Sequence, residues 1–430
     1  MRKLLLIPSL FFVSIIQSQD IIKEYVKKNT SQIFSIDPDS TDYDDLKNFG
    51  DAIGEARIVL LGEQEHGDAG TFLAKSRLIK YLHEKKGFNV LAFESDFFGL
   101  TEGWDNLQKT KEAIDSFMYK NPFPIWSRCN TISNLFYNYL AVTNKTSTPL
   151  NIAGFDSQLH GNYTETKYIT RLTEILNKIE LVHPIYKADI RLTLKNADSI
   201  ILKYGNVRNK DTLSTNKSIQ FLENLLSNDV TKIFSSFEIQ VIRSLIAELN
   251  SSKIVNGSGI VKHYFRDKQM AENIEWLFQT KYPNEKIIVW AHNAHIAKNY
   301  GSSKWQLNEN SMMGHYLSKS PILKDKIYVV GFTSFNGYTQ WATVSKFQHK
   351  IQNPPKNGFE NWMPKNYQYA FTDFNAFNLK YAYPKVNFSM KGSIYDYKQH
   401  GNFVTDWTKA FDGVFFIREM YGCKVISGNK

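Results

Sequence analysis

The chain has 430 residues, of which 42% are hydrophobic, 14% aromatic and 22% charged. This composition excludes a disordered, collagen-like or low-complexity protein and supplies enough apolar side chains for a large core. The formal net charge of +10 arises from scattered lysines and arginines rather than from a basic stripe, so we expect no nucleic-acid partner. The length suits one large α/β domain with an insertion, or two domains, and we expect a single domain over residues 20–430.

The chain begins with the pattern of a secretory signal peptide. Positive charge at Arg2 and Lys3 precedes an apolar run over residues 4–16, which is too short to span a bilayer comfortably. We predict a signal peptide over residues 1–19, cleavage near its end, and export to the periplasm or out of the cell. The alternative is an uncleaved membrane anchor. No later stretch is apolar for long enough to cross a membrane, so we expect no membrane span after cleavage.

The chain contains only two cysteines, Cys129 and Cys423. They are too few for a disulfide scaffold or a cysteine-rich zinc module. They could form one bridge, and the sequence leaves open whether they meet. We expect the protein to act as a monomer.

Six short apolar runs, separated by helical patterns, predict the fold. The runs cover residues 57–61, 88–93, 150–155, 286–290, 326–332 and 413–417. Near-continuous apolar runs are typical of strands that are buried on both faces of a sheet. Helical patterns cover residues 71–86 and 266–281. The alternation predicts an α/β protein with a parallel-rich central sheet flanked by helices.

Residues 160–260 have a different pattern, which predicts an α-helical insertion between the third and fourth strands. Four segments have helical periodicity, at residues 168–179, 190–203, 218–226 and 237–249. An insertion in this place often forms a wall or lid over a ligand crevice, and we expect that here from position alone.

Polar residues follow directly after several of the predicted strands. Glu63 and His66 follow the first, Glu94 the second, and His292 and His295 the fourth. Because the ligand crevice of a parallel sheet lies beyond the carboxyl ends of its strands, we expect these side chains to meet there. Asp156 follows the third strand and has either a turn role or a role in the site.

This set of residue types suits hydrolysis of an ester. A carboxylate beside an imidazole, as in Glu63 and His66, raises the basicity of the ring and fixes its tautomer. Lys75 lies early in the next helix and can supply positive charge, while His292 or His295 can polarise a carbonyl. We therefore predict a small-molecule ester as substrate, with water activated by His66.

Other interpretations stay open at this stage. Each histidine could have a capping or core role, Glu94 could cap a helix, and Lys75 could be a solvated helix charge. Glu63 and His66, with the pair His292 and His295, could also bind zinc or iron, although no His-Glu-x-x-His motif occurs. The chain lacks Gly-x-Ser-x-Gly and the glycine-rich nucleotide motifs, so we predict neither serine catalysis nor a nucleotide, and no cofactor.

Four segments, in this order and spacing, resemble the erythromycin esterase family. They are Leu61-Gly-Glu-Gln-Glu-His-Gly67, Gly87-Phe88 leading to Phe93-Glu94, Arg266-Asp-Lys-Gln-Met-Ala-Glu-Asn273 and Trp290-Ala-His-Asn-Ala-His295. The resemblance covers roughly residues 50–420. It implies metal-independent hydrolysis of a lactone or ester by an activated water.

The resemblance also implies residue roles. The general base of the family falls on His66 and its companion glutamate on Glu63, while Glu94, His292 and His295 match the later motifs. Asp156, Arg266 and Arg77 are the candidates for substrate binding. A distant likeness to haem-binding proteins keeps a non-catalytic haem or small-molecule binder as a further alternative.

Two positions depart from the macrolide-hydrolysing members. The macrolide-hydrolysing members carry arginine where this chain has Lys75, and they often carry a glutamate where this chain has Gly70. Lysine is a point charge and cannot make the planar two-point contact of arginine, which Arg77 would replace in part. These departures weaken the case for macrolide hydrolysis, and with it a role in antibiotic resistance, more than the case for hydrolysis itself.

Overall fold

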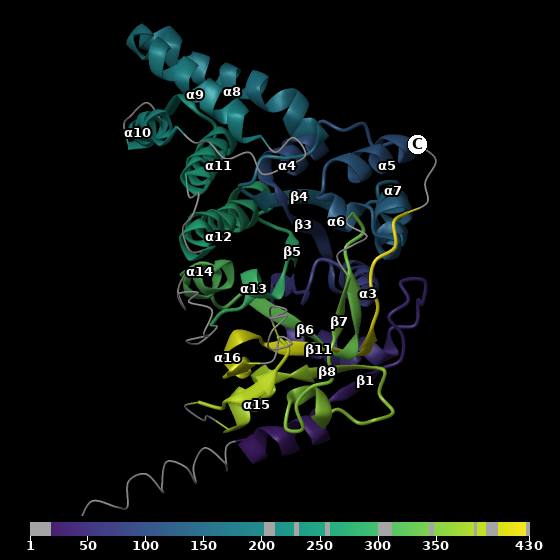
Figure 1. Ribbon diagram of the computed structural model, residues 1–430. Coiled ribbons are helices and arrows are strands. Elements are labelled where there is room, and N and C mark those ends of the chain that lie inside the picture. The colour runs from purple at the N-terminus through teal and green to yellow at the C-terminus, as the bar shows by residue number, and fades with distance from the viewer. Residues whose placement is uncertain are drawn as a thin grey trace, which may run out of the picture.

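A nine-stranded, mostly parallel sheet forms the centre of the molecule (Figure 1). The computed structural model describes residues 19–201, 211–227, 232–253, 259–299, 312–343, 348–381, 385–392 and 403–426. The predicted signal peptide, up to residue 18, therefore lies outside the described residues. No helix of the described ranges is both long and apolar enough to cross a membrane.

Six parallel strands carry the fold, and all six were predicted as apolar runs. They are β2 (Ile58–Leu61), β3 (Phe88–Asp96), β4 (Asn151–Asp156), β5 (Lys286–Trp290), β6 (Ile327–Gln340) and β11 (Gly413–Met420). Their order in space is β11-β6-β2-β5-β3-β4. The predicted fold class, a parallel-rich sheet flanked by helices, is confirmed.

The remaining strands were not predicted. β8 (Tyr369–Asp373) pairs antiparallel with β11, β1 (Ser31–Ile33) with β8, and β7 (Gln348–Ile351) with β6. Separately, β9 (Phe388–Met390) and β10 (Phe403–Thr405) form a two-stranded sheet. These additions make the sheet mixed, but they leave the parallel centre unchanged.

The central strands are buried on both faces, as their apolar runs predict. Val59 and Leu61 of β2 belong to one core cluster, whereas Ile58 and Leu60 belong to another. This alternation follows from the two-residue period of a strand. Helices cover the two faces: α3 (Ala69–Lys86) on the first, and α12 (Gly259–Trp276) and α14 (Met313–Lys319) on the second.

Shorter helices complete the described layers. They are a helix over residues 19–29, α2 (Lys47–Ile53), α4 (Phe97–Asp105), α5 (Lys111–Lys120), α6 (Pro124–Ser127), α7 (Leu140–Thr143), α13 (Asn293–Ile296), α15 (Phe374–Tyr381) and α16 (Trp407–Ala410). Short 3₁₀ and π-helical turns lie between some of them.

The insertion is helical and builds a core of its own. Its helices are α8 (Asn162–Val182), α9 (Lys187–Ile200), α10 (Thr212–Ser227) and α11 (Ser236–Ser252). Figure 1 shows them stacked beyond the β4 edge of the sheet. Phe97 and Phe98 at the start of α4 belong to the same apolar cluster, so the insertion packs against the helix that directly follows β3.

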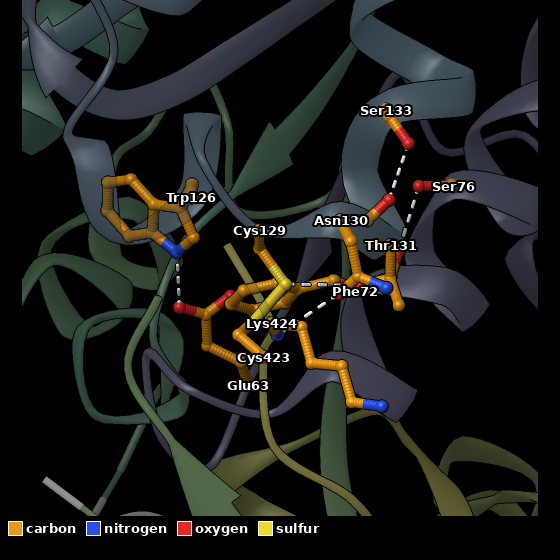
Figure 2. Close-up of a disulfide and its surroundings, with 10 residues drawn as sticks. All are labelled: Glu63, Phe72, Ser76, Trp126, Cys129, Asn130, Thr131, Ser133, Cys423 and Lys424. Carbon is orange, nitrogen blue, oxygen red and sulfur yellow. Dashed lines mark hydrogen bonds between the residues drawn. A yellow bond between two sulfur atoms is a disulfide. The ribbon is translucent and has the colours of Figure 1, made fainter. Parts of the chain in front are cut away.

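Cys129 and Cys423 form a disulfide, with their Cα atoms 5.2 Å apart (Figure 2). The bridge joins the segment after α6 to the segment after β11, which are 294 residues apart in sequence. The sequence alone left this pairing open.

Candidate active site

Three neighbouring parallel strands bring the predicted residues together. Leu61 of β2 and Phe93 of β3 both lie opposite Trp290 of β5 in the ladder. β2 and β5 end at these positions, whereas β3 continues to Asp96, so Glu63, Glu94 and His292 lie together at the carboxyl ends of the three strands. The His66 and His292 ring centroids are 5.1 Å apart. The convergence expected from the strand ends is therefore present in the structure.

Glu63 lies between two basic side chains at the base of the site. Its Oε1 accepts from Nδ1 of His66 at 2.8 Å, and its Oε2 accepts from Nζ of Lys75 at 2.7 Å. The Lys75 ammonium also lies 4.0 Å from the ring centroid of Trp290. Both Glu63 and Lys75 side chains are 0% exposed. The turn between β2 and α3 thus holds a buried charge network rather than a solvated one.

Burial and ion pairing have opposing effects on the pKa values of Lys75 and Glu63. Burial favours the neutral forms, and it lowers the pKa of Lys75 to about 8 even though Glu63 opposes the shift. Burial also raises the pKa of Glu63, but the charges and hydrogen bonds of Lys75 and His66 outweigh it and the pKa is lowered overall. Glu63 is therefore held as a carboxylate.

His66 is the most solvent-accessible of the predicted catalytic residues, since its side chain is 23% exposed. Its Nδ1 bonds to Glu63, and within the described ranges no hydrogen bond reaches Nε2. Burial lowers the pKa of the ring, but the hydrogen bond and charge of Glu63, with the charge of Glu94, raise it to about 9. Nε2 is the nitrogen that can meet a water or a substrate.

His292 is held by the main chain on both ring nitrogens. Its Nδ1 accepts from the Ala294 amide at 3.0 Å, and its Nε2 lies 2.7 Å from the Gln64 carbonyl, to which it donates. Burial and the neighbouring charge of His66 lower the pKa of His292 to about 3. The ring is therefore neutral, and both nitrogens are engaged. This arrangement leaves His292 no N–H for a substrate carbonyl.

A second charge network surrounds Arg266 of α12. Its guanidinium donates to Asp156, with Nε to Oδ1 at 3.0 Å and Nη2 to Oδ2 at 2.7 Å, and Nη2 also reaches Glu94 Oε1 at 2.9 Å. His295 Nε2 lies 3.2 Å from Arg266 Nη1 and 3.3 Å from Glu94 Oε1. Its Nδ1 lies 2.6 Å from Asp267 Oδ1. Asp156, Arg266 and His295 are thus brought into one buried group.

Glu94 connects the two networks. One oxygen faces Arg266, and the other accepts from the His292 amide at 2.8 Å. Burial raises the pKa of Glu94, but the charges of His295, Arg266 and His66 outweigh it and lower the pKa to about 2. Glu94 is an anion shared by both networks.

Arg77 lies elsewhere. Its guanidinium pairs with Asp45, at 2.7 Å from Nη2 to Oδ1, and donates to the carbonyls of Ser35 and Asp42. Arg77 is two residues after Lys75 in α3, which places the two side chains on nearly opposite faces of the helix. The structure therefore does not bring Arg77 to the other candidate residues, and its contacts anchor the segment before α2.

No group of three or more His, Cys, Asp or Glu side chains in the described part of the chain is placed to hold a metal ion. The carboxylate oxygens of Glu63 accept from His66 and Lys75, and those of Glu94 and Asp156 accept from Arg266.

Sequence reasoning missed three contributors to this region. Trp126 of α6 donates its indole N–H to Glu63 Oε1 at 2.8 Å. Asp267 binds His295, as given above, and Gln64 receives a hydrogen bond from Ser334 at 2.7 Å. Gln64 and Asp267 adjoin predicted residues and could have been included on that ground, whereas nothing in the sequence near Trp126 points to Glu63.

Comparisons with known proteins identify the family of the chain. Residues 83–420 match the sequence model of the erythromycin esterase family. The putative hydrolase YbfO of Bacillus subtilis is 26% identical over 347 residues, which cover 75% of each chain. The erythromycin esterase type II of Escherichia coli is 25% identical over 345 residues, covering 71% of this chain and 75% of that protein.

A solved structure shows the same fold. A mutant of the erythromycin esterase EreC in its open conformation superimposes with a TM-score of 0.64 and 17% identity, covering 93% of this chain and 99% of that one. The mostly parallel sheet and its flanking helices define an α/β protein with the erythromycin esterase-like fold. The chain belongs to the erythromycin esterase family, and membership supports hydrolase activity in general.

Proposed function

We propose that the protein hydrolyses a carboxylic ester or lactone, without a metal, through a water activated by His66. The observation that carries this proposal is the state of His66: Nδ1 is bound by a buried carboxylate, while Nε2 stays accessible beside a neutral His292. Glu63 fixes the tautomer in which Nε2 lacks a proton once the ring is neutral.

The reaction then runs through the ring of His66. Nε2 takes a proton from water, and the water oxygen attacks the ester carbonyl to give a tetrahedral intermediate. The resulting imidazolium is stabilised by Glu63. When the carbonyl re-forms, the proton passes to the leaving alkoxide, so ester and water yield an acid and an alcohol.

Arg266 is our candidate for contact with the substrate. It is 9% exposed, and its partners Asp156 and Glu94 hold the guanidinium in a fixed plane. A fixed cation at the crevice can stabilise negative charge that develops on the carbonyl oxygen. We assign Lys75 an electrostatic role through Glu63, and His295 a role in fixing Glu94 and Arg266.

We also propose that the protein is exported. The disulfide between Cys129 and Cys423 supports this proposal, because such bridges persist in oxidising compartments outside the cytosol. Mass spectrometry of the mature protein from its native host tests it: an N-terminus near residue 20 is expected, whereas an intact residue 1–19 segment would contradict a cleaved signal peptide.

A hydrolysis screen tests the activity. Purified protein is offered aryl esters, alkyl esters, lactones and macrolides, and His66→Gln is compared with His183→Gln, which changes an exposed histidine of the insertion. We expect turnover of at least one ester, a loss in kcat of about 10²- to 10⁴-fold for His66→Gln, and an unchanged rate for His183→Gln. A full rate for His66→Gln would exclude His66 as the base.

A further inference from the structure

The Glu63 carboxylate has a donor that the proposed mechanism does not use. Besides His66 and Lys75, the indole Nε1 of Trp126 donates to Glu63 at 2.8 Å (Figure 2). The acceptor is Oε1, the same oxygen that bonds His66. The Trp126 side chain is 1% exposed, and its ring stands nearly perpendicular to that of His66, with centroids 5.2 Å apart. Trp126 therefore contacts both members of the proposed acid–base pair.

The segment that carries Trp126 is short and is held by contacts with other parts of the chain. α6 spans only Pro124–Ser127, and the amide of Phe123 just before it donates to Ser95 Oγ at 3.2 Å. Three residues after Trp126, Cys129 is bonded to Cys423. The Asn130 amide donates to the Lys424 carbonyl at 2.9 Å, which extends this attachment.

The other half of the disulfide reaches the turn of His66. The Cys423 amide donates to the Gly67 carbonyl at 3.2 Å and to the Gln340 carbonyl at 3.0 Å. One covalent bond thus joins the Trp126 segment to a segment that is hydrogen-bonded beside His66. Figure 2 shows Trp126, the disulfide and Glu63 gathered in one region.

We infer that Trp126 is a positioning residue for His66, which acts by holding the Glu63 carboxylate, and that the Cys129–Cys423 disulfide holds Trp126 in place. The inference rests on the proposed function of His66 as the base. The physical reason is competition: Trp126 and His66 share one oxygen, so the indole donor reduces how strongly that oxygen holds the imidazole proton.

Loss of the indole donor has a defined direction. Without it, Oε1 bonds His66 alone, the imidazolium is held more tightly, and the pKa of His66 rises. One neutral hydrogen bond corresponds to a shift of about half to one pH unit. The titratable groups that face His66 are Glu63 and Glu65 of its own turn, Lys75 of α3 through Glu63, Glu94 of β3, and His292 after β5. Trp126→Phe leaves all of them in place.

The first experiment follows the His66 ring directly. The pH titration of the imidazole nitrogens is recorded by NMR in the wild type, in Trp126→Phe and in a control, Trp104→Phe. Trp104 is also buried at 1% exposure, and its Nε1 has no hydrogen-bond partner among the described residues. We expect the His66 titration to move upward in Trp126→Phe and to stay at the wild-type value in Trp104→Phe.

The second experiment tests the disulfide in a cycle of variants. We expect Cys129→Ser/Cys423→Ser to shift the His66 titration in the same direction as Trp126→Phe, and to add no further shift when the two changes are combined. A disulfide with a merely structural role would lower Tm in both backgrounds and leave the titration unchanged. Should Cys129→Ser/Cys423→Ser fail to fold, native wild-type protein reduced with dithiothreitol replaces it, with circular dichroism as the check on folding.

These readouts need no substrate, so they separate this inference from the proposed function. An unchanged His66 titration in both Trp126→Phe and the reduced protein overturns the inference even if the enzyme hydrolyses esters. An upward shift supports it even if the ester screen finds no turnover. Where a substrate is found, the rising limb of kcat/KM should move upward with the titration.

Discussion

Replacing Glu63 by glutamine tests the electrostatic reasoning for the site most directly. Glu63→Gln keeps the size and shape of the side chain but removes the negative charge between His66 and Lys75. The pKa of His66 is about 9, against an ordinary value of 6.5. At about 1.4 kcal/mol per pH unit, this difference corresponds to roughly 3 kcal/mol of added stabilisation of the imidazolium. Burial acts against the charged ring, and the hydrogen bond and charge of Glu63 are the largest of the effects that raise the pKa, ahead of the charges of Glu94 and Glu65.

The expected result is a fall in the pKa of His66 by more than two pH units. In the wild type, kcat/KM should rise with pH up to about 9, because only the neutral ring can accept a proton from water and about 1% of the ring is neutral at pH 7. In Glu63→Gln the rising limb should move below pH 7. The maximal rate should also fall, since a less basic ring is a weaker proton acceptor and its imidazolium lacks a counterion.

Two further variants make the result interpretable. Removing Glu63 leaves the buried Lys75 ammonium unpaired, which can cost about 3–5 kcal/mol of folding free energy, so Glu63→Gln/Lys75→Met removes both charges. Glu65→Gln removes a neighbouring carboxylate that bonds the His66 amide rather than its ring, and a smaller shift is expected. If NMR shows His66 in Glu63→Gln still titrating near pH 9, the carboxylate does not set its basicity and the reasoning fails.

Two other predictions concern the second network and metal ions. Arg266→Met should leave Asp156 and Glu94 as buried carboxylates without their shared cation. We expect the free energy of unfolding, measured in urea, to fall by about 3–5 kcal/mol. A fall below about 1 kcal/mol would show that the ion pairs of Arg266 contribute little to folding. Dialysis against EDTA should leave both ester turnover and Tm unchanged, with elemental analysis as the check. A loss of turnover that added zinc restores would instead favour a metal-dependent hydrolase.

The sequence predicted the parallel centre of the sheet because burial on both faces leaves a strong pattern. β2 reads Ile-Val-Leu-Leu, and all four residues are buried. β7 has the sequence Gln-His-Lys-Ile, in which only the isoleucine is buried, and β1 is three residues long. Such edge strands depend on a partner for their structure rather than on their own apolar pattern, so sequence periodicity could not reveal them.

The candidate site was predictable only where strand ends determine position. Glu63 and His292 follow β2 and β5, and Glu94 lies near the end of β3. These three strands are neighbours in the sheet, so parallel order alone brings the side chains together. Trp126 reaches Glu63 from a short helix 63 residues further along the chain, and no local pattern indicates that contact. Arg77 could have been excluded from the predicted site on helix geometry alone. Two residues of a helix correspond to a rotation of about 200°, so Arg77 and Lys75 point to nearly opposite sides.

Lys75 replaces the arginine of the macrolide-hydrolysing members, and its burial bears on the effect of that replacement. The side chain is 0% exposed, and its ammonium is engaged by Glu63, by the Ala291 carbonyl at 3.4 Å and by the ring of Trp290. Because the buried ammonium is out of reach of a substrate, we expect this position to act on the proposed reaction through the charge of Glu63. Lys75→Arg would have to fit a larger, planar cation into the same closed space. Whether a macrolide is a substrate therefore depends on the side chains around the accessible face of His66, and exchanging residue 75 alone should not confer macrolide hydrolysis.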